Sequence, residues 1–422
     1  MLPRRRELPA SNQASSSGWL TARRLRAHAL IFAISLWGVY AWQLSTPGLR
    51  DRSGNLKGTD FLHFYTLGLL ANEHRGTDLY EMGPQAQMAA EHVPQAAGIR
   101  YLPLYPPQVS LLFAPLARLP YGHAMAVWWT VSALLYGICC YAFWARCPNL
   151  ARYGGIVVLA ALGYPAFFHL IAWGQTSALA LACFTGMFLL LRRKHGFLAG
   201  LLLGCLAFKP QLALGPTLVL LLAGNWTILA GAVLSAAAQF AVAVAFYGSQ
   251  PLIRWIECLR STPSLLPLLE PKPYQTHCLR TFWSMLAPWP GVAFVLYLLS
   301  AAAAIAIAAV IWRRNRETDM GIGFSALLLI SVLVAPHLTV YDLVILVPAI
   351  LLLANRIIAS PEQPAARRLG VVLYLVYALP LLGPLARWTH LQLSVIAMSV
   401  CLIGIWKWTS RETPASPPAA SS

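Results

Sequence analysis

Long apolar runs recur along the whole chain and are separated by short polar segments. Most of them approach or exceed the roughly 18 to 20 residues that an α-helix needs to cross a bilayer, and they do not alternate with polar residues as the strands of a barrel would. Between residues 197 and 224, Lys209 and Pro210 interrupt the apolar sequence, which predicts two short spans or a re-entrant pair. The pattern therefore predicts an all-α polytopic membrane protein with about 12 transmembrane helices, two of them short or re-entrant. The ten longer runs cover residues 29–46, 123–144, 153–171, 176–191, 227–247, 290–312, 321–336, 342–354, 369–386 and 391–406.

The composition excludes a soluble globular protein. Apolar residues make up 58% of the 422 residues, charged residues only 11%, and the mean hydropathy is +0.61. Roughly a quarter of the residues are charged in an average soluble domain. A net charge of +17 would suit nucleic-acid binding, but most basic residues lie in short segments between apolar runs. We therefore expect membrane lipid, and no nucleic acid, among the partners.

The basic residues predict which ends of the spans face the cytoplasm. No small-x-small cleavage pattern follows the first run, so we expect an uncleaved first span. An N-terminus inside the cell places 19 of the 31 basic residues in cytoplasmic segments, against five of the 14 acidic residues. The positive-inside rule thus predicts a multi-pass protein of the cytoplasmic membrane with both termini in the cytoplasm.

The same pattern divides the chain into three parts. Residues 1–28 form a basic, partly disordered N-terminus, residues 29–406 a single transmembrane domain, and residues 407–422 a largely disordered cytoplasmic tail. Two outer loops within the domain, 47–122 and 248–288, are too long to be mere connections, and long ordered loops usually carry function. We find no internal repeat of the kind that an inverted-repeat transporter contains.

The eight cysteines fall into two groups. Cys258 and Cys278 both lie in the second outer loop, where the compartment permits a disulfide. They are either paired, closing a loop of about 20 residues, or two free thiols. The other six lie in or beside spans, where they are small packing residues. No Cys or His cluster has metal-ligand spacing, so the sequence predicts no metal and no cofactor.

The segment after the first span contains a candidate catalytic carboxylate. Thr59 is a candidate N-cap, which places Asp60 in the first turn of a short helix, where the helix dipole stabilises a carboxylate. We expect this helix to lie at the membrane surface, with apolar and aromatic anchors. Asp60 then either caps the helix or acts as a general base at the boundary between water and lipid. The expected anchors are Phe61, Phe64, Tyr65 and Leu69.

Several short motifs, taken in order, resemble glycosyltransferase family 87 over about residues 58 to 350. None is specific alone; their order and their placement on the predicted spans carry the resemblance. After His337 the chain departs from the family pattern, because it reads Leu-Thr-Val-Tyr-Asp where a second aromatic residue or histidine is expected. The matching motifs are Asp60-Phe61, Phe64-Tyr65, Leu79-Tyr80, Tyr105-Pro106-Pro107, Trp173-Gly174-Gln175-Thr176-Ser177, Lys209-Pro210-Gln211, and Pro336-His337 with Tyr341.

The resemblance implies a C-type glycosyltransferase fold and an inverting enzyme whose active site lies at the outer membrane face. It implies a polyprenyl-phosphate-linked donor of mannose or another hexose, and a glycan or glycolipid acceptor. Asp60 suits the role of base, while Lys209 and His337 suit stabilisation of the departing phosphate, because intramembrane ionisable residues are costly enough to indicate function. Donor or substrate contacts are further implied for Gln175, Tyr65, Tyr105 and Tyr341.

Structural roles remain open for several of these residues at this stage. Lys209 is otherwise a snorkelling lysine, His337 an interfacial residue and Gln175 a hydrogen-bonding residue between helices. We interpret Gly200 and Gly204 as close-packing positions. Trp128 and Trp129 are interpreted as interface-belt residues, and the basic residues of the second outer loop either bind lipid phosphate or are solvated. Alternative functions are a transporter, a flippase for lipid-linked saccharides, and a polysaccharide ligase or polymerase.

Overall fold

The computed structural model describes residues 21–412, and within this range the protein contains helices and no named strand. Only the backbone is described for Pro263, Leu266, Pro267, Arg411 and Glu412. Residues 1–20 of the predicted N-terminal part and residues 413–422 of the predicted tail lie outside the described residues. The last helix, α19 (Leu393–Glu412), includes the first residues of the tail predicted from residue 407.

Within residues 21–412, seven helices are long and apolar enough to cross a membrane, or eight if a pair that bends by 44° between Leu162 and Pro165 is one span. This confirms a polytopic all-α protein, while the predicted number of about 12 spans also counts shorter helices. The long helices are α1 (Ala22–Leu44), α5 (Tyr121–Trp144), α11 (Trp226–Tyr247), α14 (Pro290–Asn315), η7 with α16 (Val340–Leu346, Val347–Ile358), α17 with η8 and α18 (Pro364–Ala378, Leu379–Leu385, Ala386–Thr389), and α19.

Shorter apolar helices fill the interior and correspond to the remaining predicted spans. The break predicted at Lys209 and Pro210 is present, because one helix ends before Lys209 and the next begins at Gln211. The bent pair is η4 and α6 (Pro148–Tyr153, Gly154–Leu162) with α7 (Pro165–Trp173), and the short helices are α8 (Ser177–Arg192), α9 with η5 (Gly196–Gly204, Cys205–Phe208), α10 (Gln211–Leu222) and α15 (Met320–Leu333).

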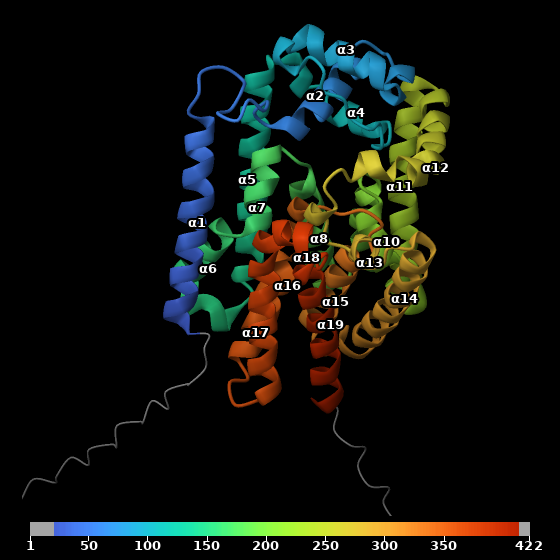
Figure 1. Ribbon diagram of the computed structural model, residues 1–422. Helices are drawn as coiled ribbons and strands as arrows, with labels where there is room; N and C mark the ends of the chain where they lie inside the picture. The colour runs from blue at the N-terminus through green and yellow to red at the C-terminus, as the bar shows by residue number, and fades with distance from the viewer. Residues whose placement is uncertain (1–20, 413–422) are drawn as a thin grey trace, which may run out of the picture.

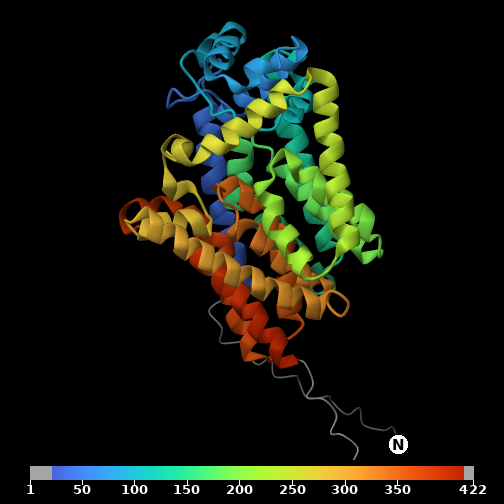
Figure 2. The ribbon, with the colours of Figure 1, turned by 90° about the vertical axis from the view of Figure 1, so that its right-hand side faces the viewer.

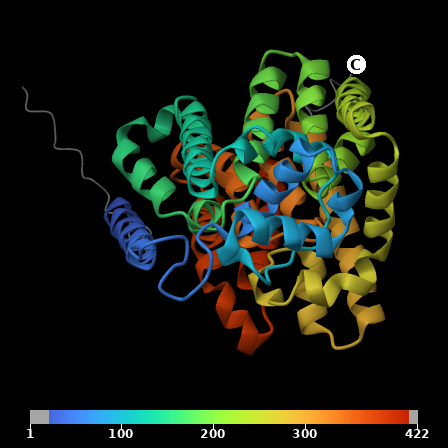
Figure 3. The same ribbon diagram turned by 90° about the horizontal axis from the view of Figure 1, so that it is seen from above.

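Both long loops are largely helical, and the helices of the first loop lie together at one end of the molecule (Figure 1). α1 begins and α19 ends at the lower end in Figure 1, while the helices of the first loop form a layer at the upper end. Figures 2 and 3 show the same layer from the side and from above, over the ends of the bundle helices. The first loop contains α2 (Thr59–Asn72), η1 (Thr77–Tyr80), α3 (Met82–His92), η2 (Pro94–Ala96), α4 (Gln108–Phe113) and η3 (Leu116–Arg118), and the second contains α12 (Gln250–Leu269), η6 (Pro273–Gln275) and α13 (Leu279–Leu286).

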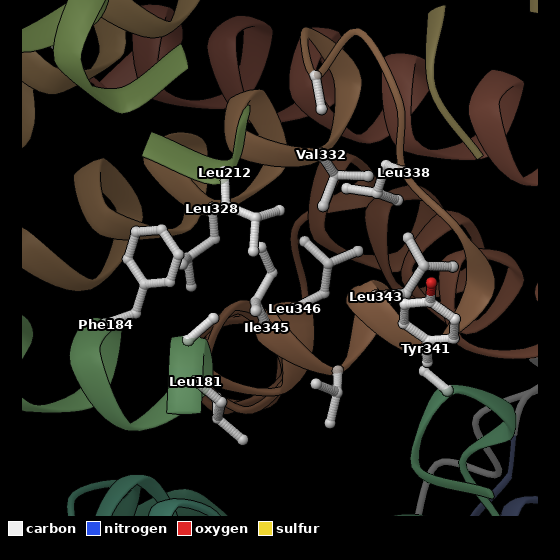
Figure 4. Close-up of a cluster of buried hydrophobic side chains, with 14 of the residues drawn as sticks. Leu181, Phe184, Leu212, Leu328, Val332, Leu338, Tyr341, Leu343, Ile345 and Leu346 are labelled. Carbon is white, nitrogen blue, oxygen red and sulfur yellow. The ribbon is translucent and has the colours of Figure 1, made fainter. Parts of the chain in front are cut away.

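The centre of the bundle is an apolar core built from α8, α10, α15 and η7. Figure 4 shows Leu181 and Phe184 of α8 facing Leu212, Leu328 and the side chains of η7. Twelve consecutive residues of α15 and all seven of η7 are buried. A helix that is apolar on every side is stable only when protein or lipid surrounds it. This is why η7 can hold polar side chains at its start, away from water.

Helix α9 packs against α11 through glycines, as predicted for Gly200 and Gly204. A Cβ atom at Gly200 would lie 2.0 Å from the carbonyl oxygen of Ile228, and one at Gly204 would lie 2.2 Å from that of Ala232. Gly231 of α11 faces α9 in the same way, with Phe197 O at 2.2 Å from the position of its Cβ. Small residues thus bring the two backbones into contact, which stabilises helix pairs in membranes by van der Waals packing.

Candidate active site

Four polar side chains from helix starts and from turns between helices meet in one region at the upper end of the bundle. Asp60 lies in the first turn of α2, Gln175 lies in the turn between α7 and α8, and Lys209 lies between η5 and α10. Asp342 lies in the first turn of η7. Non-helical backbone at membrane depth is tolerated where it is buried in protein, and such breaks leave polar groups free to bind a substrate.

Asp60 is held by the amide of Gln175. Gln175 Nε2 donates to Asp60 Oδ2 at 2.6 Å, and the hydroxyl of Tyr105 donates to Gln175 Oε1 at 3.4 Å. Burial raises the pKa of Asp60 from 3.8 to about 6, although the Gln175 hydrogen bond and the charge of Lys209 oppose this rise. A carboxylate with a pKa close to neutral is suited to accept a proton from a substrate.

The start of α2 differs from the prediction at its first residue. Gly58 is the N-cap, with a left-handed φ of 66°, and a Cβ there would lie 2.6 Å from Met125 Sδ. Thr59 is instead the first helical residue, and its hydroxyl donates to Leu56 O at 2.8 Å. The position predicted for Asp60 in the first turn is confirmed.

Helix α2 is buried in protein, so its prediction as a surface helix with membrane anchors is wrong. The reason is tertiary, because α3 and α4 pack on α2 and cover the side that the sequence alone would leave at the interface. Aromatic side chains of α2 therefore pack against Phe113 and Trp128. The four expected anchors have exposed fractions of 0% for Phe61, 1% for Phe64, 3% for Tyr65 and 6% for Leu69.

The same packing fixes the turn that carries Gln175. Trp128 is buried, and its Nε1 donates to the carbonyl oxygen of Gly174 at 3.0 Å, so it is not an interface-belt residue. Gly174 has a φ of 70°, and a Cβ at this position would lie 2.6 Å from Phe61 Cβ. A left-handed glycine therefore lets the turn approach α2 closely enough for the contact between Gln175 and Asp60. Trp129, next in the sequence, is half-buried.

Lys209 and Asp342 form a buried ion pair beside this turn. Lys209 Nζ lies 2.5 Å from Asp342 Oδ1, and the Ser177 hydroxyl donates to the same oxygen at 2.5 Å. The side chains of Lys209 and Asp342 are 4% and 2% exposed, so Lys209 does not snorkel to a surface. The Lys209 ammonium also lies 4.8 Å from the centre of the Tyr341 ring, whose edge contacts Trp173. A buried charge without a partner is costly, which accounts for the pairing.

His337 belongs to a second ion-pair cluster. Its Nδ1 lies 2.7 Å from Glu270 Oε1, and Arg280 pairs with the same carboxylate and donates to Pro336 O. Burial alone would raise the pKa of Glu270, but the His337 hydrogen bond and the Arg280 charge hold it below its ordinary value. Lys209 and His337 thus have different acidic partners, and Arg280 is bound to protein rather than free in solvent.

The three predicted tyrosines have different surroundings. Tyr105 and Tyr341 lie near Asp60. The hydroxyl of Tyr105 donates to Gln175, and the ring of Tyr341 lies against the ammonium of Lys209. The hydroxyl of Tyr65 instead donates to Leu119 O at 2.9 Å, and its ring packs against Tyr121. Tyr65 therefore positions the segment before α5 and is not bonded to Asp60, Gln175, Lys209 or Asp342, which we call the Asp60 cluster.

Of the two alternatives for Cys258 and Cys278, the structure contains two free thiols. The elements separate them: Cys258 lies on α12, which packs against η1, whereas Cys278 is buried at the start of α13. The Cys278 thiol lies 3.5 Å from the hydroxyl of Thr281.

Three polar residues of this region were not identified from the sequence. Asp342 is the only acidic residue between 320 and 361, so its position in an apolar run was the feature that could have marked it as a functional candidate. Ser177 belongs to one of the matching motifs but was given no role, and His63 gave no comparable signal, because a single histidine is common in apolar helices. Among residues 21–412, no group of three or more His, Cys, Asp or Glu side chains could hold a metal ion.

Comparison with known proteins agrees with the resemblance seen in the motifs. The family model of glycosyltransferase family 87 matches residues 104–336, which is more than half of the chain. The chain belongs to glycosyltransferase family 87. It is therefore a polytopic membrane glycosyltransferase that takes a sugar donor and an acceptor. No curated protein and no solved structure matches the chain.

The matched range includes part of the candidate site of this family 87 protein. Tyr105, Gln175 and Lys209 lie within residues 104–336. Asp60 precedes the matched range, and His337 follows it by one residue. The proposed roles of Asp60 and His337 therefore depend on their positions in the fold rather than on the match.

Proposed function

We propose that this family 87 enzyme transfers mannose or another hexose from a polyprenyl monophosphate to a glycan or glycolipid acceptor. The reaction takes place at the outer face of the cytoplasmic membrane, with inversion at the anomeric carbon. The observation that carries the proposal is the Asp60 carboxylate, held by Gln175 beside a buried lysine where four helix breaks meet. Membership of the family favours this enzyme over the transporter or flippase that the sequence had left open.

Asp60 is the base of the proposed reaction. It accepts the proton of an acceptor hydroxyl while the hydroxyl oxygen bonds to the anomeric carbon of the donor sugar. The bond from that carbon to the phosphate oxygen breaks, and its electron pair leaves with the polyprenyl phosphate. Because the oxygen attacks on the side opposite the phosphate, the configuration inverts. Gln175 holds the Asp60 carboxylate in place for this proton transfer.

Lys209 and His337 are the proposed groups for the leaving phosphate. The ammonium of Lys209 lies in a site of low dielectric, where a cation stabilises growing negative charge far more than it does in water. Its pairing with Asp342 reduces the net charge but leaves it an N–H donor near Tyr341. His337 is 24% exposed and Arg280 15%, so their cluster retains surface that a phosphate group can contact.

The distribution of basic residues supports an outer site. Arg23, Arg24 and Arg26 lie at the start of α1, and Arg313 and Arg314 lie at the end of α14, both at the lower end in Figure 1. Positive residues concentrate on the cytoplasmic side of membrane proteins. The upper layer with Asp60 then faces the outside, where the sugar of a polyprenyl-phosphate donor is accessible to an acceptor.

Substitution of Asp60 by asparagine tests the proposed base. Asp60→Asn keeps the size of the side chain and removes its basicity, so transfer from a polyprenyl-phosphate hexose should fall by about a hundredfold or more. In the wild-type enzyme, kcat/KM should decline as the pH falls below about 6, because the carboxylate must be ionised. Transfer of radiolabelled sugar by purified protein measures both.

Asp78→Asn is the matched control. Asp78 lies in η1, in the same layer, and pairs with Arg75. Its side chain is 23% exposed. The control should retain activity close to that of the wild type. Wild-type turnover by purified Asp60→Asn, at any pH, would refute the role of Asp60 as base.

A further inference from the structure

Asp342 is bound through both carboxylate oxygens, and the proposed reaction does not use it. Its Oδ1 accepts from Lys209 Nζ and from the Ser177 hydroxyl, both at 2.5 Å, and its Oδ2 accepts from the backbone N–H of Thr339 at 3.3 Å. The carboxylate forms a capping box with Thr339 at the start of η7. Asp342 is therefore fixed in position by three different segments of the chain.

Two of these segments, the turn that contains Ser177 and the segment that contains Lys209, also interact with Asp60. Ser177 follows Gln175 by two residues, and Gln175 donates to Asp60. Lys209 Nζ contacts Asp342 Oδ1 at 2.5 Å, and the charges of Lys209 and of Asp342 both act on Asp60, with opposite signs. The ionisable groups that face Asp60 from the elements around it are Lys209, Asp342, Tyr101, Tyr105, Tyr121 and Tyr341.

We propose that Asp342 is a positioning residue for Asp60, which holds the Lys209 ammonium between the two carboxylates and anchors the turn of Gln175 through Ser177. This inference rests on the proposed role of Asp60 as base. An ammonium paired only with Asp60 would keep that carboxylate strongly ionised and make it a weaker base. The negative charge of Asp342 offsets part of the electrostatic effect of Lys209 on Asp60, so that the Asp60 carboxylate remains basic enough to accept a proton. The four tyrosines are neutral at working pH, so the net charges that act on Asp60 are those of Lys209 and Asp342.

The test measures protonation of Asp60 directly, in the full chain in detergent. A hydrophobic carbodiimide reacts with protonated carboxyl groups, and mass spectrometry of the peptide that contains Asp60 gives the extent of labelling at each pH. Asp342→Asn should lower the midpoint of labelling by about one pH unit, because it removes a negative charge and leaves Lys209 to Asp60. Lys209→Met should raise the midpoint by a similar amount.

Two further variants make the result specific. The double variant Asp342→Asn with Lys209→Met should return the midpoint close to that of the wild type, because the two opposite effects cancel. Asp319→Asn is the matched control, since Asp319 caps α15 and pairs with Arg356 away from the site. Its midpoint at Asp60 should equal that of the wild type. The acid limb of kcat/KM should move in the same order as the labelling midpoints.

Each outcome decides the proposal. Single variants that both leave the Asp60 midpoint unchanged, or that both move it in the same direction, would overturn it. A loss of thermal stability without a shift of the midpoint would assign Asp342 a structural role only, and would also overturn it. Labelling does not require turnover, so absence of glycosyl transfer by the wild type would refute the proposed function while the midpoints still test Asp342.

Discussion

His63 lies one helical turn after Asp60 and has no hydrogen-bond partner at either ring nitrogen. The side chain is 4% exposed, and its ring packs against Tyr101 and Tyr105 at centroid distances of 4.9 and 5.6 Å. Burial lowers its pKa to about 3, so the imidazole is neutral in the folded protein. A buried polar atom without a partner costs about 1 to 3 kcal/mol. His63 thus destabilises the wall of the candidate site.

Replacing His63 by phenylalanine should stabilise the protein, because the ring contacts remain and the two unpartnered nitrogens are lost. Below pH 6.5 the unfolded chain takes up a proton at His63 that the folded protein cannot bind until about pH 3. Wild-type stability is therefore lost as the pH falls through this window. The difference in melting temperature between His63→Phe and the wild type should widen from pH 7 to pH 5.

The exposed His123 supplies the comparison, because His123→Phe changes the same residue type without removing a buried group. Melting in detergent, followed by intrinsic fluorescence, measures all three proteins. A difference between His63→Phe and the wild type that is constant with pH would contradict the account of His63 as a buried neutral histidine.

At the scale of elements, the interior depends on short helices that are held by backbone contact rather than by length. α9 has only nine residues, and a single helix of that length cannot cross a bilayer. Its glycines let it pack against the backbone of α11, and its continuation through η5 ends at Lys209. The position of Lys209 in the site therefore depends on the contact between α9 and α11.

Gly200→Ala should destabilise this contact. The added Cβ would meet the carbonyl oxygen of Ile228 at 2.0 Å, and because this atom belongs to the backbone, one of the two helices must move. We expect a loss of about 1 to 3 kcal/mol, the usual range for overpacking, and a fall in transferase activity as Lys209 shifts.

Gly137→Ala in α5 is the matched control, since nothing lies within 4 Å of its added Cβ. It should leave the melting temperature unchanged or raise it slightly, because alanine is the better helix former. Equal melting temperatures for Gly200→Ala and Gly137→Ala would show that the contact between α9 and α11 accommodates a Cβ atom at position 200, and would contradict this prediction.

For the whole molecule, the main feature is a difference between the two ends. The upper end contains the helical layer and the Asp60 cluster, and the lower end contains the start of α1 and the end of α19 (Figure 1). Helix α8 begins at Ser177, which contacts Asp342, so the turn between α8 and α9, with Arg192, Arg193 and Lys194, lies at the opposite end of α8 from this contact. The upper layer contains the acidic side chains Glu73 and Asp78. Such asymmetry favours insertion with the lower end in the cytoplasm.

Single cysteines test this orientation. Asp78→Cys should react with a membrane-impermeant maleimide in intact cells, whereas Lys194→Cys should react only after lysis. The wild type, with its eight native cysteines, supplies the background. Labelling of Lys194→Cys but not Asp78→Cys in intact cells would place the Asp60 cluster on the cytoplasmic side and refute the proposed outer site.

The sequence by itself determined the apolar helices, the break at Lys209 and the place of Asp60 in the first turn of a helix, because hydropathy and helix starts depend on neighbouring residues. It did not determine which charges meet. Lys209 and Asp342 are 133 residues apart, and only the packing of α10 and α15 beside η7 brings them together. Burial of α2 was likewise decided by α3 and α4, which cover a side that the local pattern predicts to be exposed. Pairing and burial depend on contacts between distant segments, so the tertiary structure alone decided the partner of each buried charge.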